Sequence, residues 1–190
     1  MLALQLSVKL FAADPDAVEV ERFTAIFHGW IQENRIPHQL LIDVADYRHV
    51  PDGPAILLVG HEAHYSIDRE RGPLGLLYNR KRDEPGELED KLVEALRDAL
   101  SACRLLEEDP GRPIRFRGDR ARLAILSRRF APNTEETWAA ARPAIEAVCA
   151  RLWPGLPVAL SHRGDPREPF AVDVEAPGAP GVADLLARLS

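Results

Sequence analysis

Two stretches of the chain run through the same succession of sequence patterns, and this repetition limits the folds open to it. Each stretch has a strand pattern, Phe-Ala, a helix pattern with tryptophan, a proline, a strand pattern, a turn signal and another strand pattern. Phe11 and Pro37 are 26 positions apart, and Phe130 and Pro157 are 27 positions apart. The spacing predicts a degenerate internal duplication. Coincidence is the alternative, because strand-helix-strand-strand is a common order of elements.

Hydrophobic periodicity defines the elements of the first half. Leu4 to Leu10 alternates apolar with polar residues, which predicts a half-buried strand. Apolar residues from Val20 to Ile31 recur at spacings of three, four and seven, the pattern of one helix face. The pattern predicts two further strands and a long amphipathic helix, over Leu40–Val44, Ala55–Val59 and Glu87–Glu107.

The second half repeats the pattern with different residues. Gly118-Asp119 is a turn signal between two short apolar runs, which predicts a hairpin of Ile114–Arg117 with Leu123–Leu126. Asn133-Thr134 is typical of the start of a helix. The sequence then predicts two strands and a short closing helix, over Val158–Leu160, Phe170–Val174 and Val182–Leu189.

These elements predict an α+β fold in one domain over residues 1–190. The two β-α-β-β halves would cover about 1–109 and 110–190, with Asp109-Pro110-Gly111 between them. We expect a mixed or antiparallel sheet in each half, with helices on one side and the halves packed together. Ala55–Val59 is apolar on both faces, which indicates either a strand covered on both sides or a sheet face that needs a second chain.

Composition limits the possible functions. The formal net charge of −6 argues against nucleic-acid binding by the whole surface. No stretch approaches the ~18 apolar residues of a membrane span, and the N-terminus lacks the pattern of a signal peptide. Cys103 and Cys149 lie in predicted helices without the spacing of a disulfide framework or a zinc site. We therefore expect a cytoplasmic protein with no membrane partner and no cofactor.

Three segments of the first half resemble an uncharacterised family of bacterial proteins. They are Phe27–Gln32, Asp43–Pro54 and Gly60–Glu62. The resemblance covers roughly the first half of the chain. It supports the domain assignment, and it implies no activity, cofactor or partner.

The densest polar cluster is the first candidate site. Its candidate site residues are Asp43, Asp46, His61, Glu62 and His64, on either side of a turn that should pair their strands. The cluster also includes Tyr47, His49, Tyr65 and Asp68. Imidazole and carboxylate groups together suit a metal ion or general acid/base catalysis. Because side chains alternate along a strand, only two of His61, Glu62 and His64 would lie on one face. The other interpretation is that these histidines satisfy hydrogen bonds near a strand end.

A basic segment is the second candidate site. Arg115 and Arg117 alternate with apolar residues on a predicted strand, and Arg120 and Arg122 follow closely. Arginine side chains bind phosphate or carboxylate through two parallel hydrogen bonds, so the segment up to Arg129 is a candidate anion or nucleic-acid site. The other interpretation is a solvated sheet face paired with the many glutamates of the chain.

The sequence thus favours a non-catalytic binding or assembly module. This hypothesis depends on missing catalytic motifs, since neither a nucleophile elbow nor a phosphate-binding glycine loop is present. Its partner would be a protein or a small ligand, and a homo-oligomer is possible. The alternatives are a metal-dependent or acid/base enzyme using the histidine cluster, and an anion or nucleic-acid binder using the arginines.

Overall fold

The computed structural model describes residues 5–50, 53–70, 72–82, 85–111, 114–162 and 164–189. Within these ranges helices separate single strands from groups of consecutive strands. In chain order the elements are β1 (Leu6–Ala12), α1 (Arg22–Gln32), β2 (Leu41–Asp46), β3 (Pro54–Gly60), β4 (Ala63–Asp68), β5 (Gly75–Arg80), α2 (Leu88–Glu107), β6 (Phe116–Ile125), α3 (Glu135–Leu152), β7 (Ala159–His162), β8 (Phe170–Glu175) and α4 (Val182–Arg188). None of these helices is long and apolar enough to cross a lipid bilayer.

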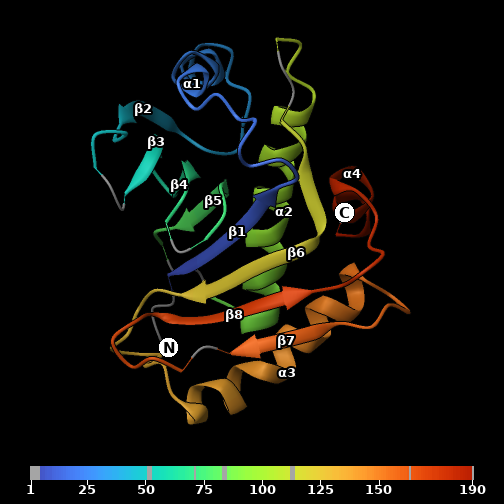
Figure 1. Cartoon of the computed structure of the whole chain (residues 1–190). Helices are drawn as coiled ribbons and strands as arrows, with labels where there is room; N and C mark the ends of the chain where they lie inside the picture. The colour runs from blue at the N-terminus through green and yellow to red at the C-terminus, as the bar shows by residue number, and fades with distance from the viewer. Residues whose placement is uncertain are drawn as a thin grey trace.

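The strands form one sheet in the order β2-β3-β4-β5-β1-β6-β8-β7, and every neighbouring pair is antiparallel (Figure 1). The α+β class, with helices packed on an antiparallel sheet, is therefore confirmed. The halves do not carry separate sheets, however. β1 from the first half pairs with β6 from the second, so the two halves share one continuous sheet.

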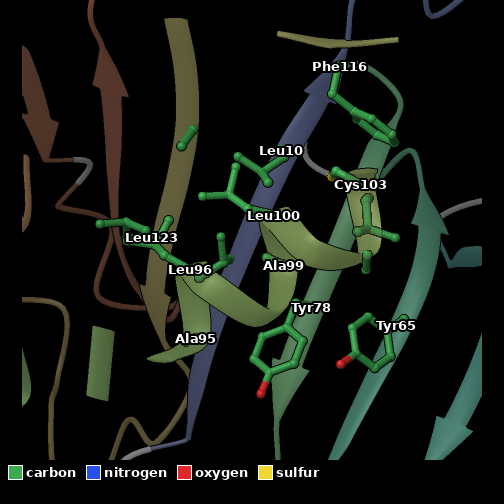
Figure 2. Packing of buried hydrophobic residues seen from close by; sticks show 14 of the residues in the cluster. Leu10, Tyr65, Tyr78, Ala95, Leu96, Ala99, Leu100, Cys103, Phe116 and Leu123 are labelled. Atoms are coloured by element: carbon green, nitrogen blue, oxygen red, sulfur yellow. The ribbon is translucent and has the colours of Figure 1, made fainter. Parts of the chain in front are cut away.

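All four helices lie on the same face of this sheet. Leu6, Val8 and Leu10 of β1 point to that face, and α2 packs directly over β1 and β5. Figure 2 shows the α2 residues that face the sheet, among them Leu96 and Ala99. Each fully buried leucine of this kind contributes about 1.5–3 kcal/mol. The helix-covered face therefore holds the hydrophobic core.

The other helices extend this cover toward the sheet edges. Phe23, Phe27 and Trp30 are the buried face of α1, which packs on β2 and β3. α3 begins after Thr134, whose side chain accepts a hydrogen bond from the Thr137 backbone as the sequence predicted. α4 packs against α2, α3 and β6 (Figure 1). The helix layer is thus continuous from β2 to β6.

The predicted hairpin at Gly118-Asp119 is wrong, because β6 runs straight through these residues. β6 pairs with β1 on one side and β8 on the other, which holds it extended. Gly118 serves close packing instead of a turn. A Cβ atom at this position would lie 1.8 Å from the carbonyl oxygen of Pro180. A glycine is therefore required at this position because a neighbouring backbone passes close to the strand, and not because the chain turns here.

The first half contains one hairpin more than the predicted β-α-β-β unit. The additional hairpin begins with β4, which a turn at His61-Glu62 folds back onto β3. In the first half, β5 pairs with the first strand, β1. In the second half, β8 pairs with the corresponding strand, β6. The internal duplication stays a prediction.

The face opposite the helices carries no covering element among the described residues. It presents the alternate side chains of each strand, including Ala55, Leu57 and Val59 of β3, which are all partly buried. β3, the strand that is apolar on both faces, is therefore covered on one side only by the described part of the chain, and a second chain over its other face stays a prediction.

Candidate functional site

A groove lies in the middle of the open face, above β4, β5, β1, β6 and β8. Its volume is about 850 Å³, within the usual range for small-molecule sites. Small side chains such as Ser7, Ala124 and Ala171 form part of its floor and leave the space above them free. We call it the open-face groove. It is lined by Ser7, Lys9, Asp68, Glu70, Gly72, Pro73, Leu77, Asn79, Arg120, Arg122, Ala124, Leu126, Asp165, Glu168, Pro169, Ala171 and Asp173.

A buried ion pair occupies one part of the floor. The Lys9 Nζ atom lies 2.6 Å from the Asp68 Oδ2 atom, and the two side chains are 2% and 1% exposed. Lys9 also donates a 2.7 Å hydrogen bond to the backbone oxygen of Glu70, which holds the loop after β4 over the sheet. Burial lowers the pKa of the Lys9 ammonium below its usual value, although Asp68 opposes that shift. The buried charge of Lys9 is balanced by a carboxylate on β4, two strands away in the sheet order.

A second ion pair lies beside the first. The Arg122 guanidinium donates two hydrogen bonds to the carboxylate of Asp173, at 2.6 and 3.0 Å. The register explains the contact, since Arg122 is directly opposite both Lys9 on β1 and Asp173 on β8. The guanidinium of Arg120 stacks on the Phe11 ring, 4.8 Å from its centre. The floor therefore presents charged groups, one of which covers a buried aromatic ring.

The predicted arginine site is divided by this arrangement. Arg120 and Arg122 line the groove, whereas Arg115 and Arg117 lie outside it. Each of the four has a carboxylate within 4 Å. The pairs are Arg120 with Glu175, Arg122 with Asp173, Arg115 with Glu107 and Arg117 with Asp119. Anion or nucleic-acid binding stays a prediction, and the contacts resemble the alternative of a paired sheet face.

The predicted histidine cluster is also divided. His61 and Glu62 form the β3–β4 turn and contact each other through Nδ1 and Oε1, and this hydrogen bond lowers the pKa of Glu62. His64 points instead to the open face, and its Nδ1 atom accepts a hydrogen bond from the Gly60 backbone. Burial, with Lys81 nearby, lowers the pKa of His64. The imidazoles of His61 and His64 therefore lie in different places, one in the turn and one on the open face.

The two aspartates of that cluster differ in their distance from the histidines. Asp43 lies opposite Val59 on β3, which lies opposite His64 on β4, so Asp43 is two strands from that histidine. Because β2 and β3 are antiparallel, Leu41 lies opposite Gly60, and Asp46 lies at the other end of the pair opposite Ile56. Asp46 is thus about 17 Å along the strand from the turn. Asp43 caps the Val44 backbone N–H at 2.8 Å. The described part of the chain contains no group of three side chains placed to bind a metal.

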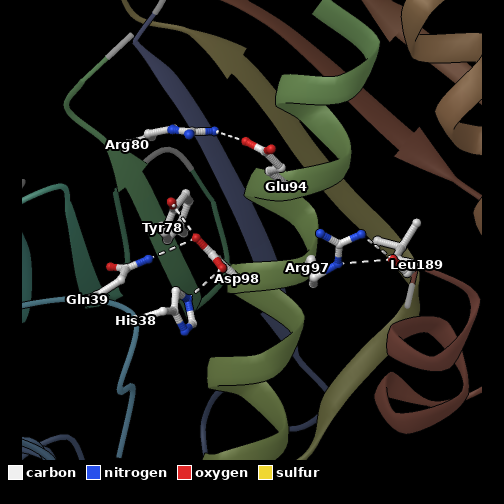
Figure 3. A network of polar contacts seen from close by, with 8 residues as sticks. All are labelled: His38, Gln39, Tyr78, Arg80, Glu94, Arg97, Asp98 and Leu189. Carbon is white, nitrogen blue, oxygen red and sulfur yellow. Dashed lines mark hydrogen bonds and ion pairs between the residues drawn. The ribbon is translucent and has the colours of Figure 1, made fainter. Parts of the chain in front are cut away.

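A polar network on the helix side was not predicted. The Asp98 carboxylate on α2 accepts hydrogen bonds from the Tyr78 hydroxyl at 2.9 Å and from Gln39 Nε2 at 2.8 Å, and it contacts His38 Nε2 at 3.1 Å (Figure 3). Nearby, Arg80 pairs with Glu94, and both line a pocket of about 380 Å³ with Asp98. The network joins α2 to β5 and to the connection after α1. Because its members are far apart in sequence, no local motif predicts this network.

The groove residues were also largely missed. Lys9 is the polar member of an alternating strand, the position that normally faces solvent. Asp68 is the last residue of β4, and no sequence pattern indicated that it would pair with a residue of β1.

Comparison with protein-family models, with curated proteins and with solved structures gave no match.

Proposed function

We propose that this protein is a non-catalytic binding module, and that the open-face groove holds a small ligand. One observation supports the proposal above the others: a groove of about 850 Å³ lies on the face of the sheet that no described element covers. Leu77, Ala124 and Ala171 supply apolar surface, and Lys9 and Asp68 supply fixed polar groups. Apolar walls with a few placed polar groups are typical of ligand sites.

The ion pairs favour binding over acid/base chemistry. Lys9 is hydrogen-bonded to a carboxylate and to a backbone oxygen, and Arg122 is held by both oxygens of Asp173. Groups held in this way are rigid, which reduces the entropy lost when a ligand binds. The proposal also places the protein in the cytoplasm, where Cys103 and Cys149 would stay reduced; both are unpaired and buried.

Ligand-observed NMR with a chemically mixed library of small molecules tests the proposal. The variant Ala171→Trp places an indole in the groove, because Ala171 lines it and is only partly buried. Ala45→Trp is the matched control, because Ala45 lies on β2, on the same open face of the sheet as Ala171 but outside the groove. We expect compounds that bind the native protein and the Ala45 variant but not the Ala171 variant. The proposal fails if no compound binds, or if every compound that binds is indifferent to Ala171→Trp.

A further inference from the structure

Three buried polar atoms in the open-face groove have no hydrogen-bond partner in the protein. They are Asp68 Oδ1, Asn79 Oδ1 and Arg120 Nε, and all three residues line the groove. The Arg120 Nε atom lies 3.7 Å from Glu175 Oε1, which is an ion-pair contact beyond hydrogen-bond distance. The Asp68 side chain is only 1% exposed. Leaving a buried polar group without a partner costs roughly 1–3 kcal/mol. A ligand that supplies these partners would remove that cost.

The three atoms differ in what they need. Asp68 Oδ1 and Asn79 Oδ1 accept hydrogen bonds, whereas Arg120 Nε donates one. They are also spread over the groove: Asn79 pairs with His64, while Asp68 lies four residues further along β4. That separation is about 14 Å along the strands. The complementary ligand must therefore offer donors and an acceptor at several points.

The basic groups of the floor already have acidic partners. Lys9 pairs with Asp68, Arg122 with Asp173, and the Arg120 Nε atom lies 3.7 Å from a carboxylate oxygen of Glu175. The lining also includes Glu70, Asp165 and Glu168, so carboxylates outnumber basic groups and an anion is disfavoured. A cation would lose its hydration and would have to compete with the basic groups of these ion pairs for their carboxylates. The groove therefore favours a ligand without charge.

We infer that the ligand is an uncharged, polyhydroxylated small molecule of the sugar or polyol class. A hydroxyl group both donates and accepts, so several hydroxyls on one ligand satisfy all three atoms. The carbon face of such a ligand lies against Leu77, Ala124 and Ala171. This inference rests on the proposed function, because it assumes that the open-face groove is the binding site.

Saturation-transfer NMR with matched sugars tests the inference. The panel contains neutral mono- and disaccharides and polyols, each monosaccharide with its uronate and amino-sugar counterpart, at millimolar concentration. We expect neutral members to bind at least tenfold more tightly than both charged counterparts. Their affinity should not change with salt, because no ion pair forms with the ligand. Ala171→Trp should abolish this binding.

Two variants examine the unpartnered atoms directly. Asn79→Leu removes one acceptor, and Arg120→Met removes the donor while it keeps an unbranched apolar side chain at that position. Each should weaken sugar binding about tenfold, the loss of one hydrogen bond, and leave the protein folded. Ser161→Leu, on the same face but outside the groove, is the control and should bind as the native protein does.

The outcomes separate the two proposals. If neutral sugars fail to bind, or bind no better than their charged counterparts, the inference is overturned. The binding module would still stand in that case if other compounds bind and respond to Ala171→Trp. If neutral sugars bind but both Asn79→Leu and Arg120→Met leave their affinity unchanged, the inference is also overturned, because the unpartnered atoms do not recognise the ligand.

Discussion

Removing the ammonium group of Lys9 tests how the open face is held together. Lys9→Met keeps the length of the side chain and its apolar stem, but it leaves the Asp68 carboxylate in the sheet without its 2.6 Å partner. With side-chain exposures of 2% and 1%, neither group of the native pair is solvated. Breaking a buried pair on one side costs about 3–5 kcal/mol. That loss is a large part of the ~5–15 kcal/mol by which a typical domain is stable.

The double variant Lys9→Met with Asp68→Leu separates the ion pair from simple packing. Replacing both partners by apolar groups removes the buried charge, so we expect most of the lost stability to return. Urea denaturation followed by circular dichroism at neutral pH gives the free energy of unfolding of each variant. The exposed pair Arg142–Glu146 on α3 is the control, where Arg142→Met should cost no more than ~0.5 kcal/mol. A loss below ~1 kcal/mol in the Lys9 variant, or a double variant no more stable than the single one, would refute this reasoning.

Three further measurements examine separate features of the structure. Arg48 holds the pKa of Asp46 at about 2 through side-chain and backbone hydrogen bonds, so Arg48→Gln should raise that pKa toward its usual 3.8 in an NMR titration of the carboxyl carbon; an unchanged value would contradict the contact. Burial raises the pKa of Cys149 to about 12 and that of Cys103 well above 9, so iodoacetamide should label neither thiol in the folded protein and both in urea. Labelling of the folded protein would contradict their burial. Gly118→Ala should destabilise the protein by about 3 kcal/mol, because its Cβ would overlap a backbone oxygen; a denaturation midpoint like that of the native protein would exclude this close approach.

The fold class was predictable because it depends on local periodicity. Alternation in β1 and the spacing of three and four in α1 and α2 follow from which side chains must face a common core. Turn signals were less informative. Gly118 marks a close backbone approach, and the turn at His61-Glu62 is made without glycine or proline at those two positions. Such cases need the neighbouring strands, which a single sequence does not display.

The candidate site was not predictable in the same way. His61, Glu62 and His64 were predicted to form a site because they are close together in sequence, but the strand pairing places His64 on the open face and the other two in the turn. Lys9 and Asp68 are 59 residues apart, and the sequence did not indicate that they would pair. Adjacency along the chain is therefore a poor guide to a site built across strands.

The sequence by itself determined that strands and helices would form and which side of each would be apolar, since residues a few positions apart set that pattern. Only the tertiary structure decided that all four helices cover the same face, and that Lys9, Asp68, Arg122 and Asp173 meet on the other. These four residues come from β1, β4, β6 and β8, and their meeting depends on strand order and register. Order and register are set by packing between segments distant in the chain, which local patterns do not encode.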